Sequence, residues 1–499
     1  MMSTAGGTSK GKRTPGAALA RVGSLAFALS LGGCFSVGTP EPRAALPDPP
    51  ATGAVAHQQA PSGQREHQRI LAAYNGTYED PKLEALVKQA VDKLVAASER
   101  PDQHYRVTIL NSPAINAFAL PSGQLYVTRG LIALANDTSE LASVLSHEMA
   151  HVIAQHAEIR EDRARQVALV TRVFDNLGSD PEMGALALAK SKIALASFSR
   201  AQEFEADGIG VGIAARAGYD PYGAVRFLSS MGRNSDLKPA AQVRLDPRAP
   251  DFLSSHPATP ERVRNAQTNA RQYSAPGAGE RDRQAYLASV DGLVYGEDPS
   301  EGFARGRRFL HPRLGFTFVA PEHFILDNTA QAVLGVREGG GQALRLDVVR
   351  VPAEQPLGQY LTSGWIDGID AASVEELGIN GFPAATATAK GDQWSFRLYA
   401  VRFGSDVYRF IYATKRMTAE VDRQFRDSVG SFRRMSLAET SAAKPLRLHV
   451  VTVAEGDTVE KLAARMATHD RAIDRFRVIN GLALGERVKP GDEVKIVTE

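Results

Sequence analysis

The sequence predicts a multidomain fold: a mainly α-helical α+β domain, then a second α+β domain, then a small βααβ domain. Its 499 residues correspond to about three domains by length. Helical periodicity dominates residues 66–275, whereas strand-like alternation dominates residues 307–436. A final strand–helix–helix–strand pattern occupies residues 446–499.

The composition is that of a globular protein with balanced charge. Lys and Arg number 58, Asp and Glu number 56, and 43% of the residues are apolar. This balance excludes a strongly basic nucleic-acid binder, so we expect no nucleic-acid partner. The chain has one cysteine, Cys34, which excludes an intramolecular disulfide.

The first 33 residues have the pattern of a secretory signal. Four basic residues and no acidic residue precede an apolar run from Val22 to Leu31, which ends in Gly-Gly before Cys34. The cysteine at this place resembles a bacterial lipoprotein signal, in which the thiol is acylated. The resemblance implies a lipid anchor at Cys34 on the periplasmic side of the bacterial envelope, and Phe35 after it favours the outer membrane. The alternative is an ordinary signal peptide.

Residues 34–65 are rich in Pro, Ala and Gly and are predicted to form a flexible tether. The first domain follows the tether and is predicted to contain helices around a small sheet. Asp137, followed three residues later by Glu140, has the spacing of a capping box that opens a helix. The predicted elements are a helix over Lys82–Ala97, strands over Tyr105–Leu110 and Gln124–Thr128, a helix from Asp137 to about Glu158, and helical patterns over 160–177 and 182–217.

A linker with a short helix is predicted over residues 276–306, before an α+β domain of unknown role over residues 307–436. This second domain resembles a PsbP-type sandwich. Its predicted elements are strands over Phe316–Val319, Leu344–Val351, Trp394–Phe403 and Val407–Tyr412, and a closing helix over Ala419–Phe432.

His147-Glu148-Met149-Ala150-His151 fits the pattern H-E-x-x-H. Histidines four residues apart lie one turn apart on one helix face, so both imidazoles can bind one metal ion. The alternative is a pair of surface histidines. A catalytic zinc needs a third protein ligand. The metzincin pattern is excluded because Ala157 stands where that class has a histidine, and His156, one position away, is expected to be structural.

Glu203 and Asp207 are the candidates that complete this site. They lie four residues apart on a predicted helix, so Glu203 can supply a carboxylate ligand while Asp207 holds a metal-binding imidazole from behind. Glu205 points to another side of the helix, and we expect it to be solvated.

Four segments together resemble the HtpX/Oma1/BepA-type zinc metallopeptidases, which are gluzincins of the Ste24-like endopeptidase family. They are Asn116-Ala-Phe-Ala-Leu-Pro-Ser-Gly, Val127-Thr-Arg-Gly-Leu, Glu140 to Val152 and Glu203-Phe-Glu-Ala-Asp. The resemblance covers about residues 70–273 and is nearest to the periplasmic lipoprotein branch. It implies a zincin fold, one Zn²⁺ bound by His147, His151 and Glu203, and Glu148 as the general base.

The same resemblance implies that unfolded or misassembled envelope polypeptides are the substrates, held by an edge strand within Asn116–Val127. Zinc would polarise the scissile carbonyl and activate water, and Glu148 would accept the water proton. Two other functions remain open: a cell-wall-bound chaperone or scaffold with little proteolytic turnover, and a purely structural zinc. No helical repeat of 34 residues is present, so a chaperone role based on such repeats is in doubt.

The C-terminal segment resembles a LysM module in Val450-Val-Thr-Val-Ala-Glu-Gly-Asp, Val478-Ile-Asn-Gly-Leu and Val488-Lys-Pro-Gly-Asp. The resemblance implies binding of peptidoglycan through residues 446–499. The alternative is a LysM fold used only for packing.

His256 lies in a run, Ser254 to Arg262, that resembles the family's H-P-x-x-x-x-R segment. Three roles are open. It could be catalytic, as a hydrogen-bond donor to the oxyanion. It could be a latch in the open position of the zinc. It could also merely pack, with Thr259 capping a helix over Glu261–Arg271.

Overall fold

The computed structural model describes residues 62–159, 198–237, 256–329, 332–391, 393–468 and 470–499. The predicted signal, Cys34 and the tether up to residue 61 lie outside the described residues, as do the helical patterns between 160 and 197. All the described residues belong to one compact unit within residues 60–499.

The first domain contains a three-stranded sheet with the order β1-β3-β2. The strands are β1 (Arg106–Leu110), β2 (Ala117–Ala119) and β3 (Gln124–Thr128), so both predicted strands are confirmed. β1 and β3 are parallel, and β2 pairs antiparallel with β3 at the sheet edge. Helix α1 (Ser62–Ala73) packs apolar side chains against Tyr126 and Phe118 of this sheet.

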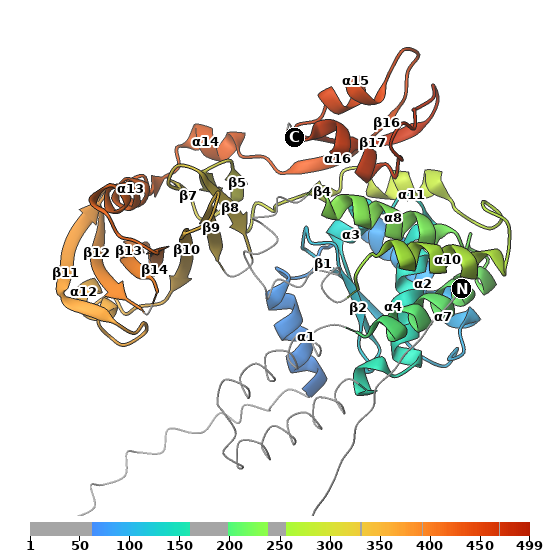
Figure 1. The fold of residues 1–499 in the computed structure, drawn as a ribbon, viewed down its shortest axis with the longest axis horizontal. Coiled ribbons are helices and arrows are strands. Elements are labelled where there is room, and N and C mark those ends of the chain that lie inside the picture. Colours follow the sequence, from blue (N-terminus) through green and yellow to red (C-terminus); the bar gives the residue numbers. More distant parts are fainter. Residues whose placement is uncertain (1–61, 160–197, 238–255, 330–331, 392, 469) are drawn as a thin grey trace, which may run out of the picture. The chain divides into compact units, whose positions relative to one another are not determined.

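Helix α4 (Thr138–Ile153) lies beside β2, next to other helices of this domain (Figure 1). Its side chains from Thr138 to His151 are all buried, and it packs against three helices. The other helices that lie in the described part of this domain are α2 (Pro81–Ala97), α3 (Arg129–Leu134), α7 (Arg200–Arg216), α8 (Gly223–Ser235) and α10 (Pro260–Arg271). Helix α7 approaches α4 closely because Gly210 has no side chain: a Cβ there would lie 3.0 Å from His147 backbone atoms.

The two ends of α4 differ in how well the sequence predicts them. Asp137 caps the start, because its side chain accepts a hydrogen bond from the backbone of Glu140. The predicted end near Glu158 is wrong, because α4 ends at Ile153. Gln155 has φ of 55°, in the left-handed region, and a helix cannot continue through that backbone conformation.

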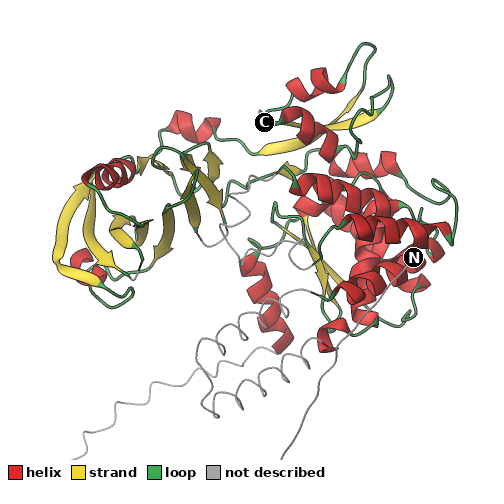
Figure 2. Ribbon diagram, viewed as in Figure 1, coloured by secondary structure: helices red, strands yellow, loops and turns green. Residues whose placement is uncertain are grey.

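The second domain is an antiparallel β structure flanked by helices (Figure 2). A seven-stranded sheet has the order β11-β12-β13-β14-β10-β9-β8, and a four-stranded sheet has the order β15-β7-β6-β5. The strands and helices are β5 (Phe303–Arg305), β6 (Arg308–His311), β7 (Phe316–Val319), β8 (Phe324–Asn328), β9 (Val333–Arg337), β10 (Gln342–Val349), α12 (Leu357–Leu361), β11 (Ile369–Ile379), β12 (Phe382–Lys390), β13 (Ser395–Phe403), β14 (Asp406–Thr414), α13 (Ala419–Gly430) and β15 (Arg433–Arg434). All four predicted strands and the closing helix are confirmed.

The C-terminal segment has the predicted strand–helix–helix–strand order. Its elements are β16 (Leu446–Thr452), α15 (Val459–Ala464), α16 (Ala472–Ile479) and β17 (Glu493–Thr498), after α11 (Arg283–Val290), β4 (Val294–Tyr295) and α14 (Leu437–Ala442). The buried Lys495 ammonium donates hydrogen bonds to the carbonyls of Ala133 and Ala135 at the end of α3. Burial lowers the pKa of Lys495 to about 7. This segment therefore packs against the first domain through a buried polar contact.

Among the described helices, none combines the length and the apolar character needed to span a membrane.

Candidate active site

Four buried side chains converge between α4, α7 and the loop before α10. His147 and His151 lie one turn apart on α4, Glu203 lies in the first turn of α7, and His256 lies four residues before α10. One ligand atom from each lies within 4.8 Å of the others. Three imidazole nitrogens and a carboxylate are ligands that zinc prefers, so these residues fit a zinc ion.

The distances show which atoms face the centre of this cluster. His147 Nε2 lies 3.1 Å from His151 Nε2 and 3.3 Å from His256 Nδ1. The Glu203 carboxylate lies 3.6 Å from each α4 histidine and 2.9 Å from His256 Nδ1. The ring nitrogens Nε2 of His147 and His151 thus face one point, as the H-E-x-x-H spacing predicts.

Asp207 on α7 and Arg262 on α10 contact the cluster from outside. Asp207 Oδ1 lies 3.1 Å from His147 Nδ1, the nitrogen that faces away from the centre. The buried Arg262 donates two hydrogen bonds to Asp207, at 2.6 and 2.8 Å, and its Nη1 lies 2.7 Å from Glu203. Burial alone would lower the pKa of His147, but its contacts with Asp207 and Glu203 raise it to about 9. A carboxylate behind a metal-binding imidazole fixes the ring and increases its basicity.

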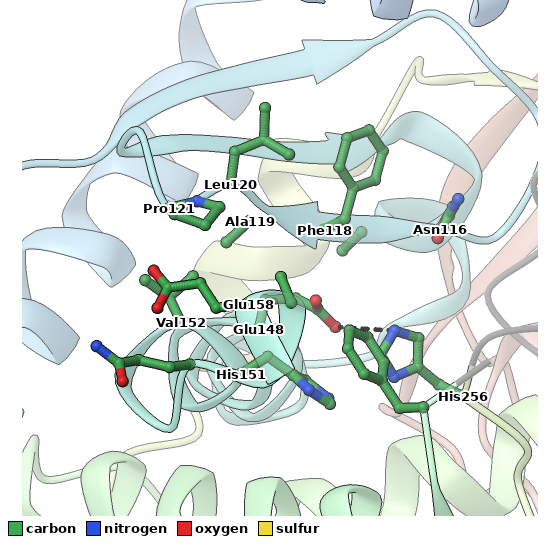
Figure 3. A pocket seen from close by; sticks show the side chains of 14 residues that line it. Asn116, Phe118, Ala119, Leu120, Pro121, Glu148, His151, Val152, Glu158 and His256 are labelled. Atoms are coloured by element: carbon green, nitrogen blue, oxygen red, sulfur yellow. Dashed lines mark ion pairs between the residues drawn. The ribbon is translucent and has the colours of Figure 1, made fainter. Parts of the chain in front are cut away.

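Glu148 lies beside the cluster and is also buried. Its Oε1 is 3.9 Å from His256 Nε2 (dashed line in Figure 3). Burial raises the pKa of Glu148, whereas the nearby His256 and His147 lower it, and the net shift is upward. A carboxylate with a raised pKa is a better proton acceptor, which suits a general base.

A cavity of about 260 Å³ opens next to Glu148 and His151. One wall is β2 and its flanking residues, and the opposite wall is the end of α4 and the turn after it (Figure 3). Most of its lining is apolar, and the lining residues are Asn116 to Pro121, Glu148, His151, Val152, Gln155, Ala157, Glu158, Phe198 and His256. Because β2 is the edge strand, its second backbone edge has no strand partner among the described residues.

The structure brings together the predicted site residues His147, Glu148, His151, Glu203 and His256, with Asp207 behind His147. Thr259 caps α10, as one reading of this run expects, and the His256 ring also reaches the cluster.

Sequence reasoning missed two contributions to the site. Arg262 is the arginine of the H-P-x-x-x-x-R resemblance, but the sequence assigned it no role, whereas the structure places its guanidinium on Asp207. Glu205 is 59% exposed, as expected for a solvated side chain, but its contact with the buried His156, at 3.3 Å between Oε2 and Nε2, was not predicted. The second contribution is therefore a contact between α7 and the turn after α4.

Known proteins are similar to the first domain. The family model described as Peptidase family M48 matches residues 81–270. The beta-barrel assembly-enhancing protease of Yersinia pestis is 30% identical over 230 residues, which are 44% of this chain and 45% of that protein. The mitochondrial metalloendopeptidase OMA1 of Schizosaccharomyces pombe is 29% identical over 39% of this chain and 54% of that protein. The chain thus spans less than half the length of the bacterial relative.

A solved structure, cyanobacterial PsbP from Synechocystis, covers 28% of this chain at 15% identity with a TM-score of 0.22. So low a score carries no conclusion about the second domain. The family match, in contrast, coincides with the segment that holds His147, Glu148, His151, Glu203 and His256. Residues 81–270 of this chain are therefore a domain of peptidase family M48.

Proposed function

We propose that this chain is a zinc-dependent endopeptidase that cleaves unfolded or misassembled polypeptides of the bacterial envelope. The observation that carries the proposal is the position of Glu148. This buried carboxylate lies between the His/Glu cluster and a cavity whose wall is an edge strand. A purely structural metal site does not require a proton acceptor beside the metal.

Each residue of the site has a role in peptide hydrolysis. His147, His151 and Glu203 would hold zinc, which when bound polarises a carbonyl and makes water more acidic. Glu148 accepts a proton from the attacking water and passes it to the leaving amine. Asp207 and Arg262 keep His147 and Glu203 in place, since both contact ligands from outside the cluster.

The cavity favours an extended polypeptide as the substrate. The free edge of β2 can pair with a substrate strand by backbone hydrogen bonds, which carry little sequence information. Apolar lining residues such as Phe118, Leu120 and Val152 can receive apolar side chains. Folded proteins bury such side chains, so this site selects unfolded or misassembled chains.

The proposed location is the periplasmic side of the outer membrane, with a lipid anchor at Cys34. The name of the bacterial relatives, beta-barrel assembly-enhancing protease, agrees with envelope proteins as substrates. Residues 446–499 would bind peptidoglycan. A packing role is the alternative for this segment, and the buried Lys495 favours it, because its side chain serves a contact with the first domain.

Cleavage of denatured casein by the purified full chain, with and without a zinc chelator, tests the proposal. We expect cleavage that stops when the chelator is added and returns when zinc is restored. Folded protein substrates should be cut much more slowly. A chain that prevents aggregation of denatured proteins but never cuts them would instead be the chaperone or scaffold.

A further inference from the structure

His151 has an outer hydrogen-bond partner that differs from that of His147. His147 contacts Asp207 directly through Nδ1. His151 contacts another imidazole: its Nδ1 lies 2.9 Å from Nδ1 of His156, whose side chain is 1% exposed. The Nε2 of His156 in turn lies 3.3 Å from the Glu205 carboxylate on α7.

The left-handed turn at Gln155 makes this contact possible. On a continuous helix, residue 156 would point about 140° away from residue 151, because each residue turns the helix by about 100°. Instead α4 ends at Ile153, the left-handed backbone of Gln155 with φ of 55° interrupts the helix, and helical backbone resumes at His156. His156 then lies against His151, with Phe198 stacked on the His151 ring at 4.0 Å between centroids.

The orientation of the His151 ring determines which ring nitrogens of His151 and His156 carry a proton. Its Nε2 faces the cluster, so a metal-binding His151 carries its proton on Nδ1. Nδ1 then donates to Nδ1 of His156, which must carry its own proton on Nε2. That Nε2 donates to the Glu205 carboxylate. Every donor along this path has an acceptor.

We infer that His156 and Glu205 are positioning residues for the metal site: His156 orients His151 and fixes its tautomer, and Glu205 does the same for His156. Glu203, Glu205 and Asp207, spaced two residues apart on α7, thus all serve the same site. Glu203 would bind the metal, Asp207 supports His147, and Glu205 supports His151 through His156. The inference rests on the proposed function only in that the cluster binds zinc.

The test is the zinc dissociation constant of the full chain, measured by competition with a chromogenic chelator. In His156→Leu the His151 N–H loses its acceptor, and we expect the dissociation constant to rise roughly 10–100-fold. His156→Gln, which keeps an acceptor and a donor, should restore part of this loss. Glu205→Gln should raise the constant about twofold to fivefold, because Glu205 is largely exposed.

Two controls separate positioning from general stability. Glu99→Gln removes an acid of similar exposure, 51%, that pairs with Arg216 of the same helix α7. His311→Leu removes a buried histidine from β6 of the second domain. Both should leave the zinc dissociation constant unchanged. If His156 had only a structural role, His156→Leu would lower the melting temperature of the zinc-free chain. It would leave the zinc affinity and the Co²⁺ absorption spectrum as in wild type.

Equal zinc affinity in wild type and His156→Leu would overturn the inference. If His156→Leu does not fold, Glu205→Gln provides the test. A zinc dissociation constant of Glu205→Gln equal to that of Glu99→Gln then overturns the inference. In the double variant, Glu205→Gln should add nothing to His156→Leu, since Glu205 acts through His156; a full additional loss would contradict this path. A wild-type chain that binds zinc but cleaves nothing refutes the proposed function and leaves this inference intact.

Discussion

Replacing Arg262 with methionine should strongly destabilise the zinc-free first domain. The Arg262 side chain is 4% exposed, and its guanidinium is shared between the buried carboxylates of Asp207 and Glu203. Removal of one partner from a buried ion pair costs about 3–5 kcal/mol, because the remaining charge is desolvated and uncompensated. For a domain of this size each kcal/mol lowers the melting temperature by about 2–4 °C, so we expect a decrease of roughly 6–20 °C.

The melting temperature of the full chain in the presence of a chelator measures this effect. Protection of α7 and α10 from hydrogen exchange shows whether the loss of stability lies in the first domain. Excess zinc should reduce the loss, because a metal bound to Glu203 compensates part of its charge. Arg216→Met on the same helix is the matched control, since its exposed ion pair with Glu99 is worth at most about 1 kcal/mol. If Arg262→Met melts no lower than this control, the electrostatic role assigned to Arg262 is wrong.

Three further predictions concern the site and the anchor. Asp207→Ala should weaken zinc binding roughly 10–100-fold without removing a ligand, as a chelator titration can measure. For His256→Ala, casein cleavage distinguishes the three roles: a fall of roughly 10²–10³-fold indicates an oxyanion donor, a rise indicates a latch, and no change indicates packing. Cys34→Ser should leave the precursor unprocessed or release the chain from the membrane fraction, whereas failure of the wild type to incorporate labelled palmitate would refute acylation.

Local patterns in the sequence predict much of the fold and the ligand set. The start of α4 follows from the cap at Asp137, and the facing of His147 and His151 follows from their helical spacing. Strands rich in apolar and β-branched residues, such as β3 and β14, also lie where predicted. These features depend on residues that are close together in the sequence. The periodicity of such short segments is visible in a single sequence.

The missed contributions depend on long-range geometry. Arg262 is 55 residues from Asp207, and no local pattern indicates that the two side chains meet. The helical pattern continues past Ile153, so the turn at Gln155, and with it the contact between His156 and His151, could not be predicted. Glu205 is largely exposed, as predicted, but its contact with His156 could not be predicted because His156 follows that turn.

In the proposed mechanism Glu148 is the proton acceptor of a zinc peptidase and binds no metal itself. Glu148→Gln keeps the shape of the side chain but removes the basic carboxylate, so casein cleavage and zinc per chain should be measured on the same preparation. We expect Glu148→Gln to abolish cleavage while zinc stays near the wild-type amount, whereas His147→Ala should lose zinc as well. Retained cleavage, or loss of zinc from Glu148→Gln, would contradict this mechanism.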